Sequence, residues 1–219
     1  MMITAHSGCD GTEDNSMPYL RHAVSLLTEA LEIDIRKDEN GTPVLSHDRA
    51  DGGKAVTLRE AFDFLAEGDK RINCDLKEYG LEEAVLRTAA DSHLNPDRLI
   101  FTGSVTDCMH FRERHPELTV FINAEELVSG FYEPYLAGRP DPAAEELLLK
   151  RCRQAGFDIL NINYRVCSEK FFRRCREEGI GLSVWTVNDP ADMLRMMTEG
   201  VENLTTRAVC EALKIRTAL

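Results

Sequence analysis

Positively charged residues are scarce in this 219-residue sequence, which has 26 Lys and Arg against 38 Asp and Glu and a net charge of −12. Nucleic acids and anionic membranes are bound through clustered Lys and Arg that displace counterions, so neither is an expected partner. An acidic protein that handles phosphate must concentrate its positive charge locally, through a metal ion or a few bases.

Long apolar runs are also lacking. No stretch approaches the ~20 apolar residues that span a bilayer, and no basic segment followed by an apolar run stands at the amino terminus. We therefore expect no stable membrane insertion and a cytoplasmic location. The seven cysteines form no C-x-x-C pair and no Cys/His ligand spacing, so neither a disulfide framework nor a zinc site is indicated.

One pattern recurs about eight times, an apolar extended run followed by an amphipathic helical run, and no Pro/Gly/Ser-rich linker divides the chain. The expected strands are Met2 to Ala5, Leu31 to Arg36, Lys70 to Lys77, Leu99 to Gly103, Thr119 to Ala124, Ile159 to Asn163, Gly181 to Val187 and Asn203 to Thr206. Expected helices include Thr57 to Ala66, Leu81 to Ala90, Pro142 to Ala155, Ser168 to Glu178 and Pro190 to Thr198. This alternation predicts an α/β protein, a compact TIM (β/α)₈ barrel formed by residues 1–219 as a single domain. A doubly wound open sheet is the alternative, which the absence of a G-x-G-x-x-G loop after the first strand weakens.

The segment from Leu31 to Asp48 carries the strongest chemical signal. Successive strand residues point to opposite faces, so Glu32 and Asp34 share one face while the alternate positions are apolar. Asn40-Gly41 predicts a hairpin turn, and the extended return that follows it brings His47 back beside the acids.

Polar residues gather where the predicted strands end. His6 follows the first strand, and Asp75 and Lys77 end the third with the same alternation as the second. Further polar or aromatic residues end the later strands, namely Ser104, Asn123, Glu125, Trp185 and Asn188. A barrel places its chemistry at this carboxyl end, so we expect these side chains to face one mouth.

In their order and spacing these residues resemble the glycerophosphodiester phosphodiesterase family. The matching motifs are His6-Ser7-Gly8, Asp14-Asn15-Ser16, Glu32-Ile33-Asp34, Asn40-Gly41, His47-Asp48, Asp75-Leu76-Lys77, Trp185-Thr186-Val187-Asn188 and the closing run from Gly200 to Thr206. The resemblance extends from about residue 3 to about residue 210.

Three departures from the family pattern stand out. Ser7 replaces an arginine that contacts the substrate phosphate in the family, and serine cannot supply a charged, bidentate fork. Lys77 and another base such as Arg36 or Arg165 would have to compensate. Only a short remnant, around residues 38–56, stands where the family inserts a longer subdomain, and Asp75 replaces a glutamate, as in sphingomyelinase D-type toxins on a similar barrel.

The resemblance implies a metal-dependent phosphodiesterase of lipid metabolism that acts on a small-molecule phosphodiester. Glu32, Asp34 and Asp75 would be the metal ligands, and their oxygen donors favour Mg²⁺ or Ca²⁺. His6 and His47 would divide the proton transfers, since histidine has an ordinary pKa of about 6.5. The implied substrate or phosphate contacts are Lys77, Ser7, Asn15 and Trp185.

Each assignment has a structural alternative. Trp185 is equally consistent with barrel packing, Lys77 with an ion pair, and Asn15 with a helix cap. The other histidines, His22, His93, His110 and His115, are assigned no role. Two other functions also remain, a noncatalytic phosphate- or metal-binding barrel marked by the Ser7 change, and a sphingomyelinase D-like lyase that forms a cyclic phosphate.

Overall fold

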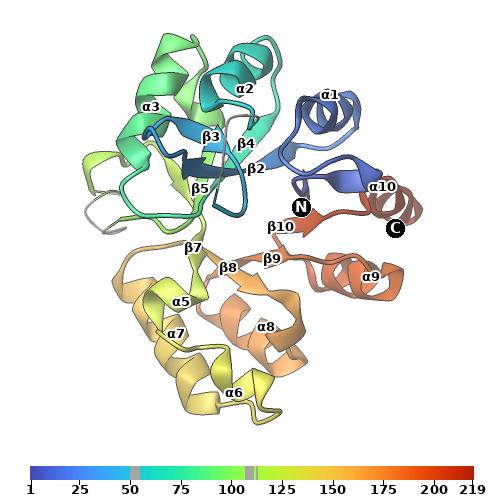
Figure 1. Ribbon diagram of the computed structural model, residues 1–219. Helices are drawn as coiled ribbons and strands as arrows, with labels where there is room; N and C mark the ends of the chain where they lie inside the picture. Colours follow the sequence, from blue (N-terminus) through green and yellow to red (C-terminus); the bar gives the residue numbers. More distant parts are fainter. Residues whose placement is uncertain (50–54, 107–110, 112) are drawn as a thin grey trace.

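The chain forms a parallel β-barrel with helices around it (Figure 1). The computed structural model describes residues 1–49, 55–106, 111 and 113–219. The strands are β1 (Met2–Ala5), β2 (Ala30–Lys37), β3 (Pro43–Leu45), β4 (Arg71–Leu76), β5 (Leu99–Gly103), β6 (Thr119–Val120), β7 (Ile122–Asn123), β8 (Ile159–Asn163), β9 (Gly181–Trp185) and β10 (Asn203–Thr206). The helices are η1 (Cys9–Gly11), α1 (Met17–Ser25), α2 (Leu58–Leu65), α3 (Glu82–Asp91), η2 (Pro96–Arg98), α5 (Ala124–Leu127), α6 (Glu133–Leu136), α7 (Pro142–Gln154), η3 (Tyr164–Val166), α8 (Glu169–Glu177), α9 (Pro190–Glu199) and α10 (Val209–Ala218).

The barrel closes through β6 and β7. Parallel neighbours follow the order β6-β5-β4-β2-β1-β10-β9-β8-β7, and only Phe121 separates β6 from β7 along the chain. The Phe121 amide donates to the Phe101 carbonyl at 3.0 Å, so the backbone continues the ring from one side to the other. The predicted strand from Thr119 to Ala124 is thus divided, because its first half pairs with β5 and its second half with β8. The predicted TIM barrel is confirmed.

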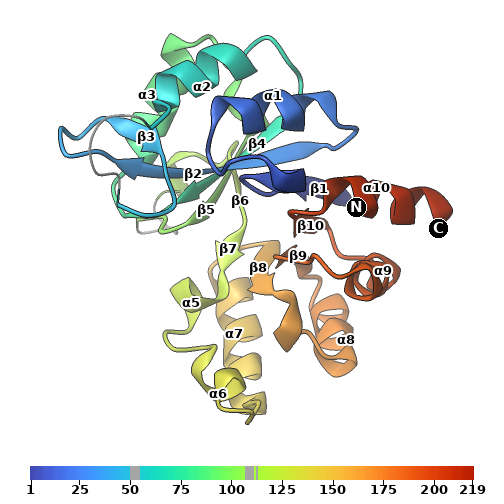
Figure 2. The same ribbon diagram turned by 45° about the vertical axis from the view of Figure 1, so that its right-hand side comes forward.

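The first and last strands meet at a seam. β1 pairs with β10 in parallel from Met2↔Asn203 to Ala5↔Thr206. Helix α10 packs against β1 and η1. The two chain ends therefore lie near each other on one side of the barrel (Figures 1 and 2).

Helix starts follow capping chemistry. Before α2, the Thr57 hydroxyl accepts from the Glu60 amide at 3.2 Å while the Glu60 carboxylate accepts from the Thr57 amide at 2.9 Å, which is a capping box. Ser168 and Asp189 cap α8 and α9. The predicted helix boundaries are confirmed to within a residue or two.

The barrel interior is polar. The apolar alternate positions of β2 pack outward against the helices, while Glu32 pairs in register with Asn73 of β4. Around the other side, a chain of hydrogen bonds between side chains, which we call the polar girdle, joins neighbouring strands through Thr4, Asn203, Ser183, Asn161 and Asn123. Each donor finds an acceptor on the next strand, so the buried polar groups are satisfied.

The predicted hairpin is present. β3 pairs antiparallel with β2, from Ile35↔Leu45 to Lys37↔Pro43, and Gly41 in the turn has a φ of 80°. Residues 50–54 of the predicted insertion remnant lie outside the described residues, as do His110 and Cys108. Among the described helices, none combines the length and the apolar character required to cross a bilayer.

Gly103, at the end of β5, is expected to resist substitution more than Gly41. Both have a positive φ, so alanine costs about 1–2 kcal/mol at either position. A Cβ at Gly103 would also collide with the Leu76 carbonyl, whereas one at Gly41 meets open space. Gly103→Ala should therefore lower the free energy of unfolding by about 1–3 kcal/mol more than Gly41→Ala, measured by urea denaturation. Equal losses would show that the strand ends can separate freely.

Candidate active site

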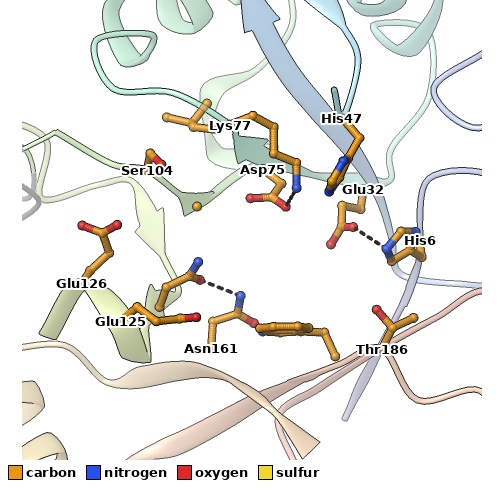
Figure 3. Close-up of a pocket in the computed structure, with 14 residues that line it drawn as sticks. His6, Glu32, His47, Asp75, Lys77, Ser104, Glu125, Glu126, Asn161 and Thr186 are labelled. Carbon is orange, nitrogen blue, oxygen red and sulfur yellow. Dashed lines mark hydrogen bonds and ion pairs between the residues drawn. The ribbon is translucent and has the colours of Figure 1, made fainter. Parts of the chain in front are cut away.

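A cavity of about 480 Å³ opens at the carboxyl ends of the strands (Figure 3). It is lined by residues from both halves of the barrel, among them His6, Glu32, His47, Asp75, Lys77, Ser104, Asn123, Glu125, Glu126, Asn161, Trp185 and Thr186. In Figure 3, the two histidines, Glu32, Asp75 and Lys77 lie on one side, and Glu125 of α5 and Asn161 of β8 lie opposite. The predicted mouth is therefore a real cavity, and most of the expected polar residues line it.

Three carboxylates from β2 and β4 converge at this cavity: Glu32 and Asp75 line it, and Asp34 is buried next to them. Oxygen atoms of Glu32, Asp34 and Asp75 lie within 4.8 Å of one another. Their side chains are 9%, 2% and 20% exposed, respectively. Burial raises the pKa of Glu32 well above its ordinary value, with a further contribution from the charges of Asp75 and Asp34. Burial also raises the pKa of Asp75. A buried cluster of oxygen donors, with ionisation opposed by burial and mutual repulsion, is chemically suited to a hard divalent cation.

Lys77 neutralises part of this charge. Its ammonium nitrogen lies 2.5 Å from Asp75 Oδ2 and 2.9 Å from Asp34 Oδ1. Burial alone would lower the pKa of Lys77, but the two aspartates outweigh burial and raise it. Lys77 is therefore a charged bridge between two of the proposed metal ligands.

Asp34 is held by hydrogen bonds as well as by Lys77. Its Oδ2 accepts from the Ser7 hydroxyl at 2.8 Å and from the Asn15 amide nitrogen at 2.7 Å. The Asp34 backbone amide donates to Asn15 Oδ1 at 3.0 Å. Burial tends to raise the pKa of Asp34, yet these partners and Lys77 lower it overall. The carboxylate is thereby kept ionised and fixed in orientation.

Ser7 and Asn15, predicted as phosphate contacts, are both buried and turn their side chains to Asp34. Helix α1 is capped by Ser16, whose hydroxyl accepts from the Tyr19 amide at 3.1 Å, and not by Asn15. The phosphate-binding role of Ser7 and Asn15 stays a prediction, while the geometry gives both a role in supporting a candidate metal ligand.

Glu32 of β2 is oriented by Asn73 of β4, which is itself held by Thr102 of β5. The Asn73 amide nitrogen donates to Glu32 Oε2 at 2.9 Å, and Thr102 donates to Asn73 Oδ1 at 2.9 Å. Thr102 was not among the predicted site residues. The alternation of β5 indicates that Thr102 faces the barrel interior. A lone threonine inside a barrel strand is common without any functional role, so this signal alone does not predict a site residue.

His6 presents one nitrogen to the carboxylates. Its Nδ1 donates to the Ser7 carbonyl at 2.9 Å, because a carbonyl can only accept. This bond places the proton of the neutral ring on Nδ1, leaving Nε2 as an acceptor 3.6 Å from Glu32 Oε1. Burial lowers the pKa of His6 from its ordinary value of 6.5.

His47 lies on the rim of the cavity. Its side chain is 63% exposed, and Nδ1 lies 3.0 Å from Asp48 Oδ1. The two histidines thus reach the same cavity from different depths.

Trp185 lines the wall of the cavity and makes an edge contact with the Tyr132 ring at 6.2 Å between centroids. Among described atoms, the buried Trp185 Nε1 has no hydrogen-bond partner.

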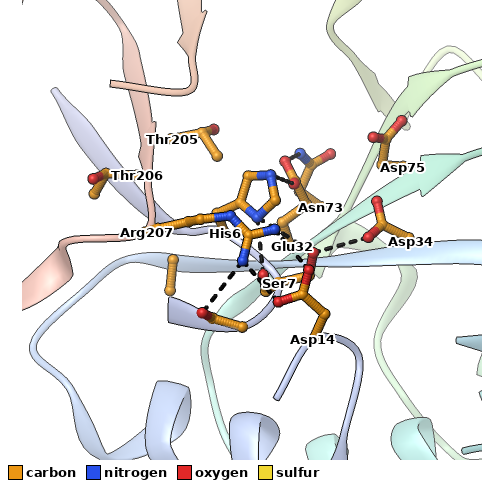
Figure 4. A network of polar contacts seen from close by, with 12 residues as sticks. His6, Ser7, Asp14, Glu32, Asp34, Asn73, Asp75, Thr205, Thr206 and Arg207 are labelled. Carbon is orange, nitrogen blue, oxygen red and sulfur yellow. Dashed lines mark hydrogen bonds and ion pairs between the residues drawn. The ribbon is translucent and has the colours of Figure 1, made fainter. Parts of the chain in front are cut away.

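Arg207 was missed by the sequence analysis. It follows β10, and its guanidinium makes two hydrogen bonds of 2.7 Å to Asp14 and one of 3.4 Å to the Gly8 carbonyl (Figure 4). It is close enough to His6 to lower the pKa of that imidazole. Its position directly after a barrel strand was the signal that could have identified it. The sequence analysis instead named Arg36 and Arg165 as the bases that could compensate for Ser7. Arg36 lies 4.0 Å from Glu78, and Arg165 packs over the Tyr164 ring.

Loss of the Lys77 charge should destabilise the fold when no divalent ion is present. Lys77→Met leaves Asp34 and Asp75 without their cationic partner, and the loss of one partner from a buried ion pair typically costs about 3 kcal/mol. Chemical denaturation in EDTA should show this loss, whereas Lys214→Met, which removes a surface partner of Glu211, should change stability by about 0.5 kcal/mol or less.

Millimolar Mg²⁺ or Ca²⁺ should then raise the melting temperature of Lys77→Met more than that of the parent protein, because an ion would supply the missing positive charge. Equal responses of the two proteins would count against a cation site at these carboxylates.

Similarity to known proteins agrees with this geometry. No protein-family model matches the chain. A curated glycerophosphodiester phosphodiesterase from Caldanaerobacter subterraneus subsp. tengcongensis is 18% identical over an alignment of 243 positions, gaps included, that covers 94% of this chain and 93% of the relative.

Solved structures resemble the whole chain. The glycerophosphodiester phosphodiesterase of Thermotoga maritima superposes with a TM-score of 0.72 at 22% identity, covering 99% of this chain and 98% of that chain. A phosphodiesterase from Oleispira antarctica, in complex with the product sn-glycerol-3-phosphate, gives a TM-score of 0.76 at 19% identity and covers 99% of this chain and 97% of that chain. The chain therefore has the fold of glycerophosphodiester phosphodiesterases, and its predicted resemblance to that family is confirmed over almost its whole length.

Proposed function

We propose that this protein is a divalent-metal-dependent phosphodiesterase that cleaves glycerophosphodiesters or related small phosphodiesters. The observation that carries the proposal is the convergence of two histidines, a carboxylate cluster and a lysine on one cavity at the carboxyl end of a barrel. The similarity to named glycerophosphodiester phosphodiesterases supports the substrate class.

Glu32, Asp34 and Asp75 would hold the metal ion, with Mg²⁺ and Ca²⁺ as the candidates for an all-oxygen site. When bound, such an ion polarises a nonbridging phosphate oxygen and stabilises the charge that develops on it. Ser7, Asn15 and Asn73 keep two of these carboxylates in place through the hydrogen bonds described above. Mutation of such supporting residues typically weakens a metal site by about 10- to 100-fold.

His6 is assigned as the general base and His47 as the general acid. Because the Nδ1 proton of His6 is bound to a backbone carbonyl, Nε2 is the atom that can accept a proton from the attacking hydroxyl. His47, on the exposed rim, can donate a proton to the departing alkoxide and regain one from solvent. The attacking group is water in a hydrolysis, or a neighbouring hydroxyl of the glycerol moiety if the product is a cyclic phosphate.

Lys77 and Arg207 supply the positive charge for the phosphate. Lys77 lines the cavity. Arg207 is not one of the lining residues but lies beside His6, and it would take the role of the arginine that is absent at position 7. Of the five N–H donors of a guanidinium, Asp14 and Gly8 occupy three, so two remain for a phosphate oxygen. Asp14 in turn fixes the orientation of the guanidinium.

Turnover of small diesters tests the proposal. Purified protein is incubated with glycerophosphocholine, glycerophosphoethanolamine or a lysophospholipid, with Mg²⁺, Ca²⁺ or EDTA, and products are followed by phosphorus NMR. We expect turnover that requires the ion, and a loss of about 10²-fold or more in kcat/KM for His6→Gln, His47→Gln and Glu32→Gln. His115→Gln, which changes a histidine paired with Glu83 and Glu117 outside the cavity, is the matched control.

If folded protein turned over none of these diesters, the proposed phosphodiesterase activity would be contradicted. A noncatalytic phosphate- or metal-binding barrel would then be favoured. Activity that survives both Glu32→Gln and EDTA would remove the metal from the mechanism. A cyclic product would identify a lyase of the sphingomyelinase D-like type.

The role of Arg207 predicts a defect in substrate affinity. Arg207→Met should raise KM by about tenfold or more, because a charge-assisted hydrogen bond contributes about 1.5–3 kcal/mol. Arg176→Met, which breaks a comparable surface pair with Glu199, should leave KM unchanged. An unchanged KM in Arg207→Met would assign the phosphate contact to another group.

A further inference from the structure

A second group of potential metal ligands lies outside the cavity, at the seam between the first and last strands. We call it the seam cluster, and its members are Cys9, Asp10, His22 and Cys210. Cys9 and Asp10 belong to η1, His22 to α1 and Cys210 to α10. In Figure 1, α1 and α10 occupy neighbouring positions on the outside of the barrel. Segments about 200 residues apart in the sequence therefore meet here.

The ligand atoms are close together. One ligand atom each from Cys9, Asp10 and His22 lies within 4.8 Å of the other two. Asp10 Oδ2 is 3.1 Å from His22 Nε2 and 3.3 Å from Cys210 Sγ. Ligand atoms around a tetrahedral ion bound at about 2.0–2.3 Å are separated by distances similar to those measured from Asp10. Cys210, which reaches the group through Asp10, would supply the fourth ligand by a rotation of its exposed side chain.

Burial is graded across the cluster. Cys9 is fully buried, the side chains of Asp10 and His22 are 15% and 33% exposed, and Cys210 is exposed. An ion could thus enter from solvent and reach the buried Cys9 sulfur. Burial raises the pKa of this thiol to about 12, so an ion that binds there displaces its proton. The backbone also holds the cluster, since the Asp10 amide donates to the Arg207 carbonyl and the Cys210 amide to Asp10 Oδ1.

We propose that the seam cluster binds Zn²⁺ through two cysteines, one histidine and one aspartate. This donor set differs in kind from the oxygen-only cluster of the cavity. Thiolate and imidazole are ligands of zinc and other borderline-soft ions, whereas Mg²⁺ and Ca²⁺ select oxygen. The cavity and the seam would therefore select different ions, and the seam site is independent of the proposed catalysis.

The seam ion would hold the loop that carries His6. That loop begins at the end of β1 and runs into η1, so an ion bound there would join it to α1 and α10 by coordination bonds. Four protein ligands leave no open position for a substrate, which is the arrangement of a structural and not a catalytic zinc site.

Cobalt substitution tests the seam site. Reduced, EDTA-treated and desalted protein is titrated with Co²⁺, whose bonds to thiolate give charge-transfer absorption in the near ultraviolet. We expect this band to saturate at one equivalent and to disappear when Zn²⁺ is added. Zn²⁺ should raise the melting temperature of the full chain by about 5 °C or more.

The variants that test the site change the more exposed ligands, Cys210 and His22. Cys9→Ser is avoided because it alters a fully buried position and can prevent folding. Cys210→Ser should halve the thiolate band, and His22→Gln should weaken Co²⁺ binding by about tenfold or more, both in variants with unchanged circular dichroism. Asp75→Asn, in the cavity cluster, and His115→Gln should leave the band intact. No thiolate band in the parent protein, or a band unchanged in both Cys210→Ser and His22→Gln, would overturn the proposal and leave the seam cluster as a hydrogen-bonded network.

Discussion

The ion pairs of Lys77 with Asp34 and Asp75 are the contacts on which the rest of the site depends. Three carboxylates inside a barrel repel one another and lose hydration, so they persist only with compensating charge and donors. Lys77 supplies the charge, and Ser7 and Asn15 supply the donors. Where many barrels pack branched aliphatic side chains, the rest of this interior carries the polar girdle, whose side chains satisfy one another by hydrogen bonds.

Most of the fold was predictable because local signals agreed with it. Apolar alternation marked Leu31 to Arg36 as a strand, and apolar residues recurring at three and four positions marked the helices. The division of the fifth strand at Phe121 was not predictable, because it results from which neighbour each half pairs with. Which strands become neighbours in a closed barrel depends on the whole chain, so no local sequence pattern predicts it.

The candidate site was predictable where strand direction alone decides the outcome. Alternation was enough to predict that Glu32 and Asp75 would face one interior, and the hairpin turn was enough to return His47 to the same rim. It was not enough for Ser7, whose burial against Asp34 depends on how the loop after β1 folds. Arg207 and Cys210 were missed for the same reason, since their partners lie at the opposite end of the sequence.

The seam between β1 and β10 has a consequence for how the protein is made. Its contacts join residues such as Thr4 and Asn203, which are 199 positions apart, and contacts of such separation must overcome the entropy of closing a long loop. During synthesis, β1 has no partner on its β10 side until nearly all of the described strands have left the ribosome. The loop bearing His6 is unsupported for the same interval, because Arg207 has not yet been added. A chain that still lacks β10 and Arg207 therefore contains the acids and both histidines without the framework that aligns them.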